Sequence, residues 1–113
     1  MKYLLAFSSP KRSSPVVTVA ANQALATGAE LIILRVVPDA EKVGIIAQLI
    51  ATDRPQEKAQ SQVDMVVAKL IEKGINARGE VRVGEVAKGI SQAAVEMNAD
   101  VLFVGTTNLH NRA

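Results

Sequence analysis

Two polar segments each follow an apolar run and carry residue types that could bind a phosphate group. The first segment contains Ser8, Ser9, Lys11, Arg12, Ser13 and Ser14. The second contains Gly105, Thr106, Thr107, Asn108, His110, Asn111 and Arg112. Hydroxyl groups, glycine backbone and positive charge at helix N-termini are what a phosphate needs. Ordinary solvated loops with helix caps have a similar composition, so both interpretations stay open on spacing alone.

The same segments offer little for catalysis. His110 is the only histidine, and no partner for a triad or a metal site is evident near it. The chain has no cysteine, which excludes disulfides, thiol catalysis and thiolate metal sites. Residues 84–89 have the GxxxxG frame of a P-loop, but Ile90 stands where the lysine must be. We therefore predict no catalytic residue and no metal site.

Alternating strands and helices must position the two segments. Apolar runs predict four strands, at residues 3–7, 31–37, 75–83 and 101–104. The third alternates only in part, which is typical of a less buried edge strand. With helices between them, the order is βαβαβαβ, which predicts right-handed crossovers and an open parallel sheet. The length of 113 residues fits a single domain, residues 1–113.

The helix boundaries follow from caps and breakers. Ser14 before Pro15 predicts the start of the first helix, and Gly28 its end. A second long helix runs from Gln56 to Gly74, and Gly84 with Glu85 opens the last one. Residues 43–50 have near-helical spacing and could form a short helix or an interface. The apolar stripes expected to face the sheet are 16–25, 59–71 and 86–97.

The sheet topology would bring the two polar segments together. In open parallel sheets, ligands bind beyond the carboxyl ends of the strands, at the point where the strand order reverses. If the strand at 3–7 is central, the strands at 31–37 and 101–104 flank it. The loops after 3–7 and after 101–104 then face each other across a crevice. The sequence therefore predicts a ligand site at this edge of the sheet.

Composition argues against several other partners. The formal net charge of +2 is too small to indicate nucleic-acid binding, and aromatic residues at 3% leave no stacking platform. No apolar stretch approaches the roughly 18 residues of a membrane-spanning helix. The apolar run at 3–7 is broken too early for a signal peptide, so we interpret it as a strand. We expect a cytoplasmic protein with no nucleic-acid or membrane partner.

Three stretches together resemble the universal stress protein family: residues 4–9, 29–37 and 83–105. In the last of these, a glycine, an inward isoleucine and then Ala-Asp, an apolar strand and Gly match the family pattern. The resemblance implies a doubly wound sheet of order 3-2-1-4-5, reduced here to 3-2-1-4 because the chain stops after its fourth strand. It also implies a cytoplasmic dimer, and many family members bind ATP or AMP.

The resemblance also implies roles for individual residues. It implies that Gly105 makes the turn at the phosphates, and that Val36 and Val37 contact a base through their backbone. Gly84 stands at the end of the third strand, and Ser8 occupies the position of the family's acidic contact. The family's second loop glycine is Asn108 here, and its last Gly-Ser/Thr pair would fall beyond Ala113. The resulting candidate cofactor-binding residues are Ser8, Ser9, Lys11, Val36, Val37, Gly84, Gly105, Thr106, Thr107 and Asn108.

Three functions stay open on the sequence. The first is a stress-response module with an adenine-nucleotide site, for ATP or AMP. The second is a nucleotide-independent regulatory or scaffolding dimer, including a module related to domains attached to transporters. The third, a nucleotide hydrolase, has the least support. Because strand 101–104 would leave an apolar edge open, we predict a homodimer or higher homo-oligomer through that edge.

Overall fold

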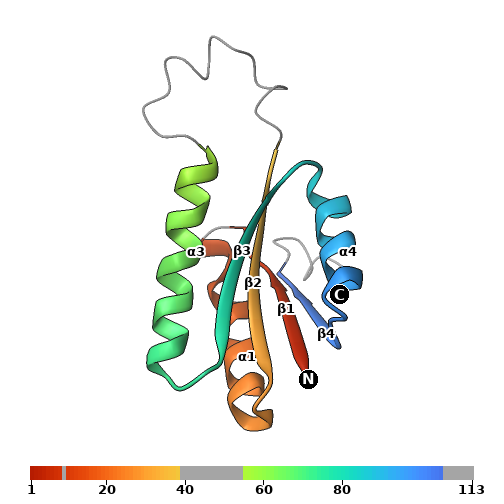
Figure 1. Ribbon diagram of the computed structural model, residues 1–113. Helices are drawn as coiled ribbons and strands as arrows, with labels where there is room; N and C mark the ends of the chain where they lie inside the picture. The colour runs from red at the N-terminus through yellow and green to blue at the C-terminus, as the bar shows by residue number, and fades with distance from the viewer. Residues whose placement is uncertain (9, 39–54, 106–113) are drawn as a thin grey trace, which may run out of the picture.

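A computed structural model describes residues 1–8, 10–38 and 55–105 of the chain. The elements in chain order are β1 (Lys2–Ala6), α1 (Pro10–Thr27), β2 (Glu30–Val37), α3 (Pro55–Glu72), β3 (Ala77–Val83), α4 (Val86–Glu96) and β4 (Val101–Val104). The strands form one parallel sheet in the order β3-β2-β1-β4, which confirms the predicted topology (Figure 1). The helix predicted over residues 43–50 lies outside the described residues.

Helices pack against both faces of the sheet because its central strands are apolar on both sides. Tyr3 and Leu5 of β1 face the core shared with α1 and α3, whereas Leu4 faces the core shared with α4. Continuous apolar runs of this kind are typical of strands buried on both faces. Six side chains of β1 and β2 are almost completely buried: Leu4, Leu5, Leu31, Ile32, Ile33 and Leu34. Each stabilises the fold by about 1.5–3 kcal/mol relative to an exposed side chain.

The predicted helix ends are confirmed, but the predicted start of the first helix is wrong. Gly28 and Gly74 have φ angles of 73° and 89°, the left-handed conformation that ends a helix. Helix α1 begins at Pro10 rather than after Ser14, and Pro15 lies inside it. Pro10 takes the first helical position that we assigned to Pro15, where a missing N–H costs nothing. The early start also carries Ser13 into the helix, where its side chain is buried.

The apolar stripes are narrower than the sequence predicted. Leu25, Ile71 and Val86 were expected to face the sheet, and all three are exposed. At the first two positions the preceding residue, Ala24 or Leu70, takes the buried position. Successive residues of a helix point about 100° apart, so two neighbours rarely both face the core. Val86 is the first residue of α4 and precedes the part of the helix that packs on the sheet.

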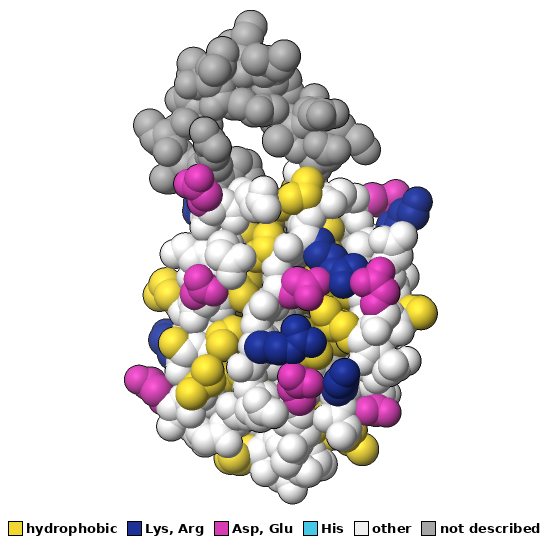
Figure 2. Space-filling view, in the orientation of Figure 1, with side chains coloured by type: hydrophobic (Ala, Val, Ile, Leu, Met, Phe, Trp, Pro, Cys, Tyr) yellow, Lys and Arg dark blue, Asp and Glu magenta, His cyan; other side chains and the backbone are white. Residues whose placement is uncertain are grey.

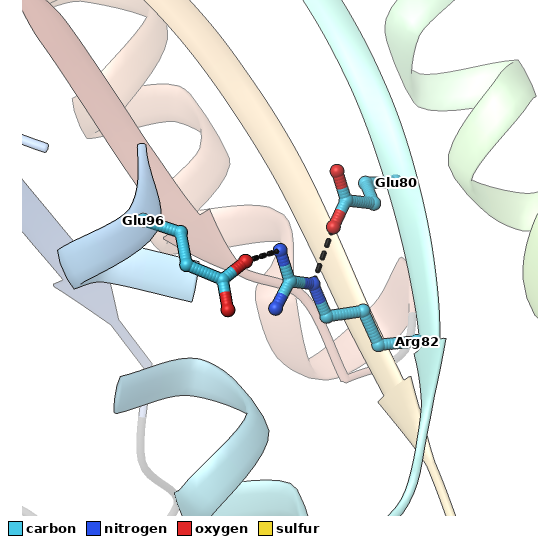
Figure 3. Close-up of polar contacts among 3 residues, drawn as sticks. All are labelled: Glu80, Arg82 and Glu96. Atoms are coloured by element: carbon cyan, nitrogen blue, oxygen red, sulfur yellow. Dashed lines mark hydrogen bonds and ion pairs between the residues drawn. The ribbon is translucent and has the colours of Figure 1, made fainter. Parts of the chain in front are cut away.

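A row of charged side chains covers one face of the edge strand β3. Arg78 forms an ion pair with Glu30 at 3.0 Å, and Arg82 pairs with Glu80 and, at 2.8 Å, with Glu96 of α4 (Figure 3). Figure 2 shows acidic and basic side chains alternating across the middle of this face. The hydrogen bonds to Glu96 and then Glu80 raise the pKa of Arg82. Charges on an edge strand discourage pairing with other chains.

Candidate ligand crevice

The carboxyl ends of β1 and β4 lie at the same edge of the sheet. Pairing between these two strands ends at Ala6 opposite Val104, and pairing of β1 with β2 ends at Ala6 opposite Leu34. The first residues after these strands, Phe7 and Gly105, therefore leave the sheet side by side, as the predicted strand order requires. β1 lies between β2 and β4, so this edge is where the strand order reverses. Four candidate residues, Ser9, Thr106, Thr107 and Asn108, lie outside the described residues.

Ser8 is held in place by two side chains. Its N–H donates to Oγ of Ser13 at 2.9 Å, and the two hydroxyl oxygens are 3.3 Å apart. Its carbonyl oxygen accepts a hydrogen bond from Nη1 of Arg35, on β2. Ser13 is 2% exposed and is the one buried polar residue in the described part of the chain. Both backbone groups of Ser8 are thus occupied, and its hydroxyl is the group that a ligand can reach.

Two basic side chains, Lys11 and Arg35, lie near this end of the sheet. Lys11 is exposed in the first turn of α1, and that turn contains no acidic residue. The helix dipole adds partial positive charge at the same end. Partial burial lowers the pKa of Arg35, because desolvation disfavours the charged guanidinium. Among the described residues, no carboxylate forms an ion pair with Lys11 or Arg35. An anionic group is the ligand chemistry that this environment favours.

Strand β2 extends past the end of β1. The Leu34 carbonyl accepts from Phe7 N–H at 2.7 Å, whereas the Val37 carbonyl accepts from Gly84 N–H at 2.8 Å. Backbone groups of successive strand residues point to opposite sides, so those of Val36 point toward β1, like those of Leu34. The Val36 N–H and C=O therefore point to the β1 side of β2, beyond the end of β1 at Ala6. The backbone groups of Val37 point toward β3 instead, where the Val37 carbonyl accepts from Gly84 N–H.

The two glycines among the described candidate residues, Gly84 and Gly105, lie at the ends of different strands. Gly84 has a φ of 144°, a conformation that strains other residues, and it turns the chain from β3 toward α4. Its N–H is already bonded to Val37, so its role is in the turn. Gly105 is exposed and follows β4 directly, beside the β1 loop. The Val36 side chain is buried under α4, where the Gly89 Cα faces it. The Val36 side chain therefore serves the core and is not available to a ligand.

Two residues that contact Ser8, Arg35 and Ser13, were not assigned any role from the sequence. Arg35 interrupts an otherwise apolar strand, Leu31–Val37, and a single charge in such a run was the signal that could have found it. Ser13 looked like one of several loop serines. Among the described residues, no group of three or more His, Asp or Glu side chains could hold a metal ion. His110 lies outside them. No described helix combines the length and hydropathy needed to cross a membrane.

Comparison with known proteins shows the family to which this chain belongs. The family model of the universal stress proteins matches residues 1–113, the whole chain. The chain belongs to the universal stress protein family. A search of curated proteins found no sequence that matches this chain. A protein of this family from Burkholderia pseudomallei has 20% identity and a TM-score of 0.76, over 98% of this chain and 85% of that one.

Two similar universal stress protein structures contain a nucleotide. The protein from Archaeoglobus fulgidus in complex with dAMP has a TM-score of 0.70 and 17% identity, over 90% of this chain and 78% of that one. The family protein from Arabidopsis thaliana with AMP bound has a TM-score of 0.69 and 14% identity, over 96% and 78%. At these identities the likeness establishes the shared fold.

Proposed function

We propose that this universal stress protein is a cytoplasmic, single-domain stress-response module that binds an adenine nucleotide, ATP or AMP, in the crevice. The observation that carries the proposal is the direction of the Val36 backbone N–H and C=O, which point to the β1 side of β2 beyond the end of β1. One N–H and one C=O side by side match the donor and acceptor on the edge of an adenine base. Similar structures that contain dAMP and AMP support this ligand class.

The charged part of the ligand would lie between the two loops. Lys11 and the N-terminus of α1 supply positive potential on one side, and Gly105 lets the backbone approach on the other. Ser8 offers its hydroxyl. Ser9, Thr106, Thr107 and Asn108 stay predicted contacts, as does the turn at Gly105. We propose binding without catalysis, because the described crevice brings no general base close to a nucleophile.

Isothermal titration calorimetry with ATP and AMP, with and without magnesium, tests this proposal. We expect micromolar affinity for one of them. Lys11→Ala should weaken binding about tenfold, since a hydrogen bond to a charged group contributes roughly 1.5–3 kcal/mol. Gly105→Val should weaken it further by blocking the approach of the phosphate. Lys69→Ala, in the last turn of α3 at the opposite edge, is the matched control. No heat at millimolar nucleotide would refute the proposal.

A second candidate function is that of a nucleotide-independent regulatory or scaffolding dimer. The observation that favours it is the apolar edge of β4, where Val101, Leu102 and Val104 are 36%, 42% and 49% exposed. Phe103 is held inward by an edge-to-face contact with Tyr3, at 5.5 Å between ring centroids. An edge of this kind is a template for pairing with another chain. A monomeric mass at tens of micromolar in sedimentation would refute pairing through β4.

A further inference from the structure

The contact between Arg35 and Ser8 links two elements that are far apart in the sequence. Arg35 is 27 residues from Ser8 along the chain, yet its Nη1 donates to the Ser8 carbonyl. The backbone of β2 on either side of Arg35 is fixed by buried side chains, Leu34 and Val36. The guanidinium therefore starts from a rigid strand and reaches across the end of β1. It ties the first residues of the β1–α1 loop to the central sheet.

Ser13 holds the same loop from the other side. Its hydroxyl is almost completely buried and accepts the Ser8 N–H at 2.9 Å. It lies on α1, so the loop is fastened to the helix by Ser13 and to the sheet by Arg35. A residue held at both its backbone N–H and its C=O, as Ser8 is, loses little further conformational freedom when a ligand binds.

We propose that Arg35 and Ser13 are positioning residues that hold Ser8, after the end of β1, in its ligand-binding conformation, with the Ser8 hydroxyl as the contact group. The inference rests on the proposed nucleotide site, which it deepens by naming what sets its geometry. The Ser8 N–H is taken by Ser13, so this loop meets its ligand through a hydroxyl rather than through the Ser8 amide. Arg35 acts through Ser8 and does not touch the ligand.

The test uses the full chain and five variants. Arg35→Met keeps the aliphatic stem but loses every donor, and Arg35→Lys restores a charged donor. Ser13→Ala removes the acceptor for Ser8 N–H, and Ser8→Ala removes the contact group but leaves the loop tied. Arg78→Met is the matched arginine control, because Arg78 pairs with Glu30 on the other face of the sheet.

Amide hydrogen exchange of Ser8, followed by NMR without nucleotide, reports the loop itself. We expect exchange at least about tenfold faster in Ser13→Ala and in Arg35→Met, with Arg35→Lys returning toward the parent chain. Ser8→Ala and Arg78→Met should leave that exchange near the parent rate. Unchanged exchange in both Ser13→Ala and Arg35→Met would overturn the proposal, whether or not the chain binds a nucleotide.

AMP affinity by calorimetry supplies the second readout. Arg35→Met and Ser13→Ala should each weaken AMP binding about tenfold, while Arg35→Lys recovers most of the affinity and Arg78→Met changes little. If Arg35→Met weakens AMP binding and leaves Ser8 exchange unchanged, Arg35 contacts the ligand directly and the positioning role is overturned. If the parent chain binds no AMP or ATP, the proposed function fails, and the exchange rates alone decide whether Arg35 and Ser13 hold the loop.

Discussion

Replacing Gly79 by alanine tests how α3 packs on the edge strand β3. A Cβ atom at Gly79 would lie 2.3 Å from Cγ1 of Val63 and 3.2 Å from Cγ2 of Val67. Optimal carbon contacts are about 3.5–4.0 Å, so α3 or β3 must shift by roughly an ångström. Val63 cannot easily turn away, because it is fully buried and β-branched side chains in a helix keep one rotamer. Gly79 itself has no left-handed φ, so the effect is steric.

The expected cost follows from two opposing terms. Overpacking a core costs about 1–3 kcal/mol, and a contact of 2.3 Å belongs at the upper end. Removing a glycine from a strand returns about 0.5–1 kcal/mol through the entropy of the unfolded chain. We therefore expect Gly79→Ala to lower the free energy of unfolding by about 2 kcal/mol. Urea titration followed by circular dichroism should show the midpoint fall by about 1–2 M, with the m-value unchanged.

Double variants make the reasoning refutable. In Gly79→Ala/Val63→Ala the new methyl group fills space that the valine vacates. The two changes should therefore be coupled by about 1–2 kcal/mol in the favourable direction. Gly79→Ala/Val67→Ala should show weaker coupling, because that contact is longer. Additive losses in both double variants, or a single variant as stable as the parent chain, would show that α3 does not pack on Gly79 in this way.

Three further changes test other contacts. Gly89→Ala gains about 0.8–1 kcal/mol of helix propensity but brings a Cβ to 3.0 Å from the Val36 side chain. We expect no net stabilisation in urea, and a clear gain would show that α4 packs more loosely. Arg82→Ala should lower the free energy of unfolding by less than about 1 kcal/mol, because the ion pairs of Arg82 with Glu80 and Glu96 are partly solvated. This loss should become smaller at high salt, and a loss that does not depend on salt would contradict the reasoning. Leu102→Lys should shift a dimer toward monomer in sedimentation, and unchanged association would place the interface elsewhere.

Much of the fold could be predicted because its signals are local. The four strands, their order and the helix endings at Gly28 and Gly74 agree with the structure. Apolar runs and residues that tolerate a left-handed φ act within a few positions of themselves. The start of α1 was misjudged because two prolines, Pro10 and Pro15, both fit a first helical position, and local rules do not rank them. The structure places Pro10 at the first helical position, and this earlier start puts Ser13 inside the helix, where it is buried.

The sequence could predict which loops lie at the candidate site, but not which backbone and side-chain atoms point into it. Placement of Ser8 and Gly105 at one edge follows from the strand order. The choice between Val36 and Val37 does not, because it depends on where β1 stops relative to β2. The pairing of Ala6 with Leu34 sets that stop, and it directs the backbone groups of Val36 to the β1 side of β2 beyond the end of β1.

By itself, the sequence determined the element types, their alternation and the strand order that places the candidate site at the carboxyl ends of β1 and β4. These features follow from the spacing of apolar residues and from the order of the elements along the chain, both of which can be read from the sequence directly. Only the tertiary structure decided that Arg35 reaches the Ser8 carbonyl and that Ser13 takes its N–H. The physical reason is register: strand pairing brings residues 27 positions apart within hydrogen-bond distance, and a shift of one residue would turn Arg35 to the other face of the sheet.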